Sequence, residues 1–144
     1  MDTQEIFEAN RTSTNRMRQI VERITPDDLL TVLSNGWTVA DTLGHLAFWD
    51  YRVIRVIELA RENHKVDSPD LDIQLNEVLL PFLKAIPPAR ISVMALELAA
   101  KLDEMLESCD EQSLTLIDAK NHRWVDRSLH RNEHLDDIES FLGH

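Results

Sequence analysis

Residues 36–50, Gly-Trp-Thr-Val-Ala-Asp-Thr-Leu-Gly-His-Leu-Ala-Phe-Trp-Asp, contain the start of a long helix and a histidine close to that start. Thr38 and Asp41 have the spacing of a capping box, in which each side chain accepts a hydrogen bond from the other residue's backbone N–H. Apolar residues then recur at helical spacing as far as Glu62, and three aromatic residues widen the apolar arc. We therefore predict a helix over residues 39–62 that is buried on two sides.

The same helical period extends outward from this segment in both directions. It predicts long helices over residues 3–24, 88–109 and 126–142, with Gly143 ending the last one. In that last helix the residues expected to face the core are Leu129, Leu135, Ile138 and Leu142.

The connections between the long helices differ in character. Thr25 and Asp28 form a second capping box, which predicts a short helix ending at Asn35-Gly36. Residues 63–88 form a long connection that carries a short amphipathic piece, and residues 110–125 are expected to be a loop with a few extended residues.

The predicted fold class is all-α, a four-helix bundle with a long crossover between the second and third helices. Only 3 glycines and 5 prolines occur, too few turn-forming residues for a β-sandwich or barrel. With 144 residues, of which 43% are hydrophobic, the chain is long enough for one core, so residues 1–144 are expected to form a single domain.

Charge and cysteine content narrow the functional classes. A formal net charge of -11 repels phosphate backbones, so we expect no nucleic-acid partner. No stretch approaches the roughly 18 apolar residues of a membrane span, so we expect no membrane partner. The single cysteine, Cys109, cannot form an intramolecular disulfide, which favours a reducing, cytoplasmic location.

Two polar residues interrupt the apolar stripe of the first helix. Asn10 and Thr14 lie on the face that otherwise carries isoleucine, phenylalanine and methionine. Two interpretations stay open: they belong to a solvent-facing part of the helix, or they line a polar cavity inside the bundle.

Three histidines form the candidate site. His130 and His134 are four residues apart, so both imidazoles lie on one face of the last helix and can reach one cation. His45 lies among apolar residues of the second helix, either as a core histidine bonded to a carbonyl or to Asp41, or as a metal ligand. Together they would make an open site with three nitrogen ligands. Ligation requires neutral imidazoles, so metal is expected to leave below about pH 6.5.

The two motifs together resemble those of the DinB/YfiT-like metalloproteins. The segment Gly36-Trp37-Thr38 through His45-Leu46 is similar to their signature on the second helix, where a tryptophan-threonine helix start precedes a ligand histidine. His130-x-x-x-His134-Leu135 resembles their closing motif. Residues 63–119 carry little of the resemblance.

The resemblance implies a four-helix bundle that holds zinc or nickel through His45, His130 and His134. It also implies a homodimer, and a metal-dependent transferase or hydrolase whose substrate is a small molecule, in some relatives together with a small thiol. The sequence identifies no substrate, and catalysis itself stays open.

Other residues near the motifs have two interpretations each. Glu133 is either a general base beside the metal ligands or a solvated surface residue. Asp50 either orients a histidine or caps the edge of the bundle. His122 precedes the last helix and is expected to be solvated, and Cys109 is expected to pack as a small apolar residue.

Two alternative functions remain. His130-Arg131-Asn132-Glu133-His134 also matches the H-x-x-E-H pattern of inverted zinc peptidases, but the only downstream glutamate, Glu139, is badly placed as a further ligand. In the second alternative the metal merely staples two helices of a module that binds a ligand or a partner.

Overall fold

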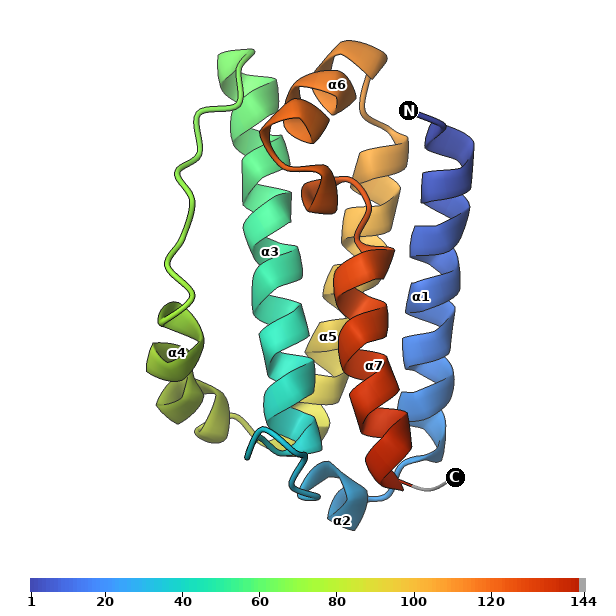
Figure 1. Ribbon diagram of the computed structural model, residues 1–144, viewed down its shortest axis with the longest axis vertical. Helices are drawn as coiled ribbons and strands as arrows, with labels where there is room; N and C mark the ends of the chain where they lie inside the picture. Colours follow the sequence, from blue (N-terminus) through green and yellow to red (C-terminus); the bar gives the residue numbers. More distant parts are fainter. Residues whose placement is uncertain (143–144) are drawn as a thin grey trace.

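Four long helices lie side by side and form the body of the molecule (Figure 1). They are α1 (Thr3–Arg23), α3 (Val39–Asn63), α5 (Pro88–Glu107) and α7 (Ser128–Leu142). In Figure 1, α1 and α7 run in one direction along the long axis, and α3 and α5 run in the other. This computed structural model describes residues 1–142, so the predicted helix end at Gly143 lies outside the described residues.

The predicted all-α fold and its four long helices are confirmed, because the described part of the chain contains helices and one isolated β-bridge between Val32 and Thr38. The predicted starts at residues 3, 39 and 88 are also correct, whereas α7 begins at Ser128, two residues after the predicted start. Both capping boxes are present, Thr25 with Asp28 and Thr38 with Asp41. In addition, no helix of the described residues is long and apolar enough to cross a membrane.

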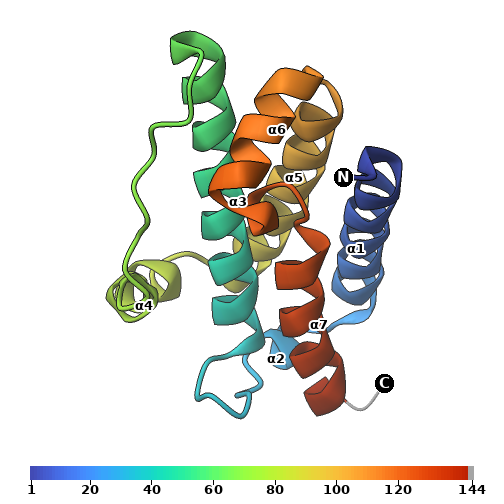
Figure 2. The ribbon, with the colours of Figure 1, turned by 45° about the horizontal axis from the view of Figure 1, so that its top comes forward.

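The crossover between α3 and α5 carries a helix on the outer side of α3. Helix α4 (Leu75–Lys84) packs against α3, and both views place it away from α1 (Figures 1 and 2). Its Leu83 approaches the backbone of Gly44 so closely that a Cβ atom on Gly44 would lie 2.9 Å from Leu83 Cδ2. The absence of a side chain at Gly44 therefore lets α4 pack directly beside His45.

Three further predictions are wrong, two about shorter segments and one about a residue of α7. The short helix α2 (Pro26–Leu29) ends well before Gly36, which instead occupies a turn with φ of 87°. Residues 110–125 are not a loop: they contain α6 (Glu111–Lys120), capped by Asp110 on Ser113, and the 3-10 helix η1 (His122–Trp124). Leu129 is 42% exposed rather than inward-facing, because Arg127 and Arg131 occupy the interior at this level of α7.

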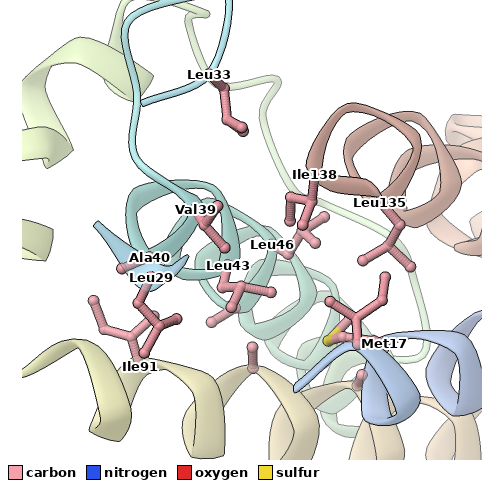
Figure 3. Close-up of a cluster of buried hydrophobic side chains, with 14 residues drawn as sticks. Met17, Leu29, Leu33, Val39, Ala40, Leu43, Leu46, Ile91, Leu135 and Ile138 are labelled. Atoms are coloured by element: carbon pink, nitrogen blue, oxygen red, sulfur yellow. The ribbon is translucent and has the colours of Figure 1, made fainter. Parts of the chain in front are cut away.

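The core consists of two apolar clusters, one in each half of the bundle. The first cluster contains Met17, Leu43, Leu46, Leu135 and Ile138 among others (Figure 3). The second contains residues nearer α6, including Ile54, Ile57, Leu106 and Ile117. Burial of these side chains is the main stabilising contribution to the fold.

A layer of buried polar side chains crosses the bundle where the two apolar clusters meet. It is formed by residues from all four long helices, namely Asn10, Ser13 and Thr14 of α1, Asp50 of α3, Asp103 of α5 and Arg131 of α7, with Arg127 just before α7. We call this set the polar layer.

Candidate metal centre

His45 lies on the second turn of α3, where the helix start is tightly fixed. The Thr38–Asp41 capping box holds the first turn, and Lys84 of α4 forms a 2.8 Å ion pair with Asp41. His45 is 5% exposed, and its ring centroid lies 5.1 Å from that of Trp37 and 6.4 Å from that of Trp49. The imidazole therefore packs beside two indole rings.

The structure brings the three predicted histidines together between α3 and α7. The ring centroid of His45 lies 4.9 Å from that of His130 and 4.5 Å from that of His134. One ligand atom from each of the three residues lies within 4.8 Å of the other two. These three residues, which we call the histidine cluster, could hold one divalent metal ion.

Hydrogen bonds indicate which nitrogen of each ring carries a proton. Arg127 Nη2 lies 3.1 Å from His130 Nδ1, and since a guanidinium can only donate, His130 Nδ1 is the acceptor. A neutral His130 then carries its proton on Nε2 and donates it to His45 Nε2, 3.0 Å away. His45 in turn carries its proton on Nδ1.

That Nδ1 atom of His45 has no partner. It is buried, and it forms no hydrogen bond with any of the described residues. An unpaired buried donor costs about 1–3 kcal/mol. The hydrogen bonds within the cluster thus leave one polar group unpaired.

Burial keeps all three imidazoles neutral. Desolvation, followed by the charge of His134, lowers the pKa of His45 to about 3. Desolvation also lowers the pKa of His130, reinforced by Arg127, and desolvation lowers the pKa of His134. Neutral imidazole is the form that binds a metal ion.

The donor set fits a divalent ion of the zinc type. Two nitrogens bound at about 2.0–2.1 Å to one tetrahedral zinc ion lie about 3.3 Å apart. The 3.0 Å between the Nε2 atoms of His45 and His130 is close to that separation. In residues 1–142 no cysteine, carboxylate or further histidine joins the cluster, so its donors are all imidazole.

The polar layer contacts His130 through Arg127. Asp50 accepts hydrogen bonds from Arg127 at 2.9 Å and from Arg131 at 3.2 Å, and Arg131 also donates to Asp103 at 2.8 Å. Burial disfavours the charged form of Arg131, yet the two carboxylates outweigh this effect and raise its pKa. Arg127 thus links the metal-ligand candidate His130 to a buried, charge-balanced network.

The structure decides between the interpretations of the polar residues in this layer. Asn10 and Thr14 face the interior of the bundle: Thr14 donates to Asp103 at 2.5 Å, and Asn10 binds the backbone of Val125, Arg127 and Ser128. Asp50 neither caps the edge of the bundle nor contacts a histidine directly. It acts on His130 through Arg127.

The remaining predicted residues lie outside the histidine cluster. Glu133 is exposed and accepts a hydrogen bond from Arg123 at 3.0 Å. His122 is exposed and bonded to Asp118 at 2.6 Å. Glu139 is paired with Arg16 and Arg23 rather than available as a metal ligand. Burial raises the pKa of the Cys109 thiol, which packs at the edge of the second apolar cluster.

Sequence reasoning missed three residues near the cluster. In the sequence, Arg127 precedes His130 and Arg131 lies between His130 and His134. Nothing in the sequence indicates that these two basic residues are buried, because the surrounding helix is rich in acidic residues. Asn76 of α4 accepts a 2.8 Å hydrogen bond from Trp49 beside His45, but it lies in the crossover, where the sequence shows no motif.

Comparison with known proteins agrees with this architecture. No curated protein and no solved structure matches the chain. The family model described as the DinB superfamily matches residues 9–140, which include α3, α5, most of α1 and α7, and all three histidines of the cluster. The chain therefore belongs to the DinB superfamily.

Proposed function

We propose that the protein binds one divalent metal ion, zinc or nickel, through His45, His130 and His134, and that it is a metal-dependent enzyme acting on a small molecule. The observation that carries this proposal is the set of three neutral imidazoles from two helices with ligand atoms within 4.8 Å of one another. Protein interiors rarely gather three such groups without a ligand, because each loses hydration and the cluster leaves one donor unpaired.

The composition of the cluster favours an open site over a structural staple. Structural zinc sites have four protein ligands, whereas catalytic sites have three and one open position. Only three candidate ligands gather here in residues 1–142. A divalent ion held by neutral ligands keeps its full charge and would supply Lewis-acid activation of a small nucleophile such as water or a thiol.

The chain's own residues have defined parts in this proposal. Trp37 and Trp49 lie beside the His45 ring, and Asp50 holds Arg127. Ligation of a metal by His130 through Nε2 would place the proton of this ring on Nδ1, so Arg127 would then give up its hydrogen bond to that nitrogen. We keep Glu133 as a proposed general base, although in this structure its carboxylate binds Arg123. A transferase acting with small thiols or a hydrolase is the reaction class we propose, and a screen of small thiols with electrophiles tests it.

Metal content tests the ligand assignment. We expect about one zinc or nickel ion per chain in the purified protein by plasma emission spectrometry, and a marked loss in His45→Ala and in His134→Ala. His122→Ala is the matched control, because His122 is exposed and lies outside the cluster. Unchanged metal content in both cluster variants would overturn the assignment.

The lowered pKa values change the pH at which metal should be released. Free imidazole competes for protons near pH 6.5, but His45 is protonated only near pH 3 in the folded protein. We therefore expect metal to stay bound at pH 6 and to leave as the pH falls toward the lower values. Release with a midpoint at pH 6.5 would show that the ligands are solvent-exposed.

Partner and location complete the proposal. A cavity of about 420 Å³ lined by apolar side chains of α3, α4 and α5, and of the segment between α4 and α5, supports an apolar contact on this side, and we propose that the protein is a homodimer. Light scattering with size-exclusion chromatography tests the mass of the assembly. The single cysteine supports a cytoplasmic location.

A further inference from the structure

The unpaired Nδ1–H of His45 needs an acceptor if His45 binds a metal through Nε2. A metal-ligating histidine almost always donates its second N–H to a carboxylate or a carbonyl, which fixes the ring and increases its basicity. His45 has the matching tautomer, with Nε2 turned to His130 and the proton on Nδ1. The acceptor must therefore come from the residues around this ring.

The neighbours of His45 leave few possible acceptors. Arg127 can only donate hydrogen bonds. Asp41, one turn earlier, already accepts from the Thr38 backbone and from Lys84 through the same oxygen, Oδ2. His134 is itself a candidate metal ligand. None of these three groups bonds the Nδ1–H of His45 in this structure, and Asp41 is held toward the start of α3 and toward Lys84 by its Oδ2 atom.

Asn76 of α4 is the remaining candidate. Its side chain is half-buried, and its Oδ1 accepts a 2.8 Å hydrogen bond from Trp49 Nε1, which fixes the orientation of the carboxamide. Asn76 lies near enough to the His45 ring to raise its pKa, opposing the larger effect of burial, although the two side chains form no hydrogen bond in this structure. A carboxamide oxygen has two acceptor positions, so it can accept from Trp49 and from His45 together.

Helix α4 is held in place on both sides of this position. Asn76 binds Trp49 near one end of α4, and Leu83 and Lys84 contact Gly44 and Asp41 near the other. All three α3 residues lie within eight positions of one another around His45. These contacts hold α4, and Asn76 with it, beside the segment of α3 that carries His45.

We propose that Asn76, supplied by the crossover helix α4, is the positioning residue for His45 and accepts its Nδ1–H when the metal binds. This inference rests on the proposed metal site. It gives the crossover, which otherwise packs only on the outside of α3, a direct part in setting the affinity of the site.

Zinc affinity, measured by competition with a chromophoric chelator, tests this inference. We expect Asn76→Ala to weaken zinc binding about 10- to 100-fold, the usual effect of losing such an acceptor. Asn76→Asp should restore binding or exceed the wild type, because a carboxylate is a stronger acceptor for the same N–H. Gln74→Ala is the matched control, since it removes an exposed amide from the start of the same helix.

A second measurement separates positioning from general destabilisation. In the zinc-bound wild type we expect a slowly exchanging Nδ1–H resonance of His45 in proton–nitrogen NMR, and its loss or fast exchange in Asn76→Ala. Trp49→Phe, which removes the donor that orients the carboxamide, should weaken zinc binding less than Asn76→Ala.

The possible outcomes distinguish the two proposals. If the wild type binds zinc and His45→Ala loses it, while Asn76→Ala and Gln74→Ala bind it equally, the role of Asn76 is overturned and the metal site stands. If the wild type itself binds no divalent metal, both proposals fall. Should Asn76→Ala fail to fold, weaker binding by Asn76→Asp would overturn the role of Asn76, and restored or tighter binding would support it.

Discussion

The polar layer and the histidine cluster are two groups of polar residues in one bundle, but they differ in how completely their hydrogen-bonding groups are paired. In the polar layer, two carboxylates and two guanidiniums balance in charge and are linked by hydrogen bonds of 2.8–3.2 Å. In the histidine cluster, three neutral rings contact one another and the Nδ1 atom of His45 has no partner. A complete network is typical of structure, whereas an incomplete one indicates a ligand.

The largest expected effect comes from breaking the polar layer. Asp50→Ala leaves the buried Arg127 and Arg131 without their shared carboxylate, and removing one partner of a buried ion pair costs about 3–5 kcal/mol. Urea denaturation of the metal-free protein measures this loss. Glu107→Ala is the control, because its partner Arg11 is exposed and such surface pairs contribute about 0–1 kcal/mol. Equal effects of the two substitutions would contradict the distinction.

A smaller effect is expected from acidifying the metal-free protein. The pKa of His45 is about 3 in the folded state and about 6.5 in the unfolded chain. The unfolded state therefore binds the proton first, and the free energy of unfolding falls as pH drops below 6.5. The decrease for this one histidine approaches about 2 kcal/mol at pH 5.

Urea titrations at pH 7.5 and pH 5.0 measure that decrease, and His45→Leu provides the comparison. The variant should lose about 2 kcal/mol less than the wild type between the two pH values. If both proteins have the same pH dependence, the His45 imidazole is not held neutral by the fold.

The smallest expected effect is a near-cancellation of two terms. His45→Leu removes the unpaired buried Nδ1–H but also takes away the acceptor of the His130 Nε2–H, so we expect the free energy of unfolding of the metal-free protein to change by less than about 1 kcal/mol. The same variant should lose its metal. His122→Leu, at an exposed position, should change the free energy of unfolding by about 0.5 kcal/mol or less. A clear loss of stability in His45→Leu would mean that the cluster contributes to the fold without metal.

The fold was predictable where the signals were local and long. Capping boxes at Thr25 and Thr38 placed two helix starts correctly, because each needs only four consecutive residues. Helix α6 was missed because it has 10 residues and only Leu114 and Ile117 of it are buried, too few to produce a helical stripe. Leu129 was misplaced because the interior of α7 at that level holds arginines, which no apolar pattern predicts.

The candidate site was predictable in its ligands but not in their surroundings. The i, i+4 spacing of His130 and His134 predicted their shared face, and the motif around His45 predicted the third ring. The pairing of Asp50 with Arg127 and Arg131 joins residues 77 and 81 positions apart. Such contacts depend on how the helices pack, and the same holds for Asn76, so one sequence does not specify them.

The polar layer also fixes how the helices are aligned along the bundle axis. Apolar side chains tolerate sliding, because one methyl group packs much like the next. A shift of α7 by one turn, about 5.4 Å, would separate Arg131 from both Asp50 and Asp103 and move its charge into an apolar cluster. Because such a shift would cost free energy, the ion pairs fix the axial register of α7 relative to α3. This register keeps the imidazoles of His130 and His45 opposite each other.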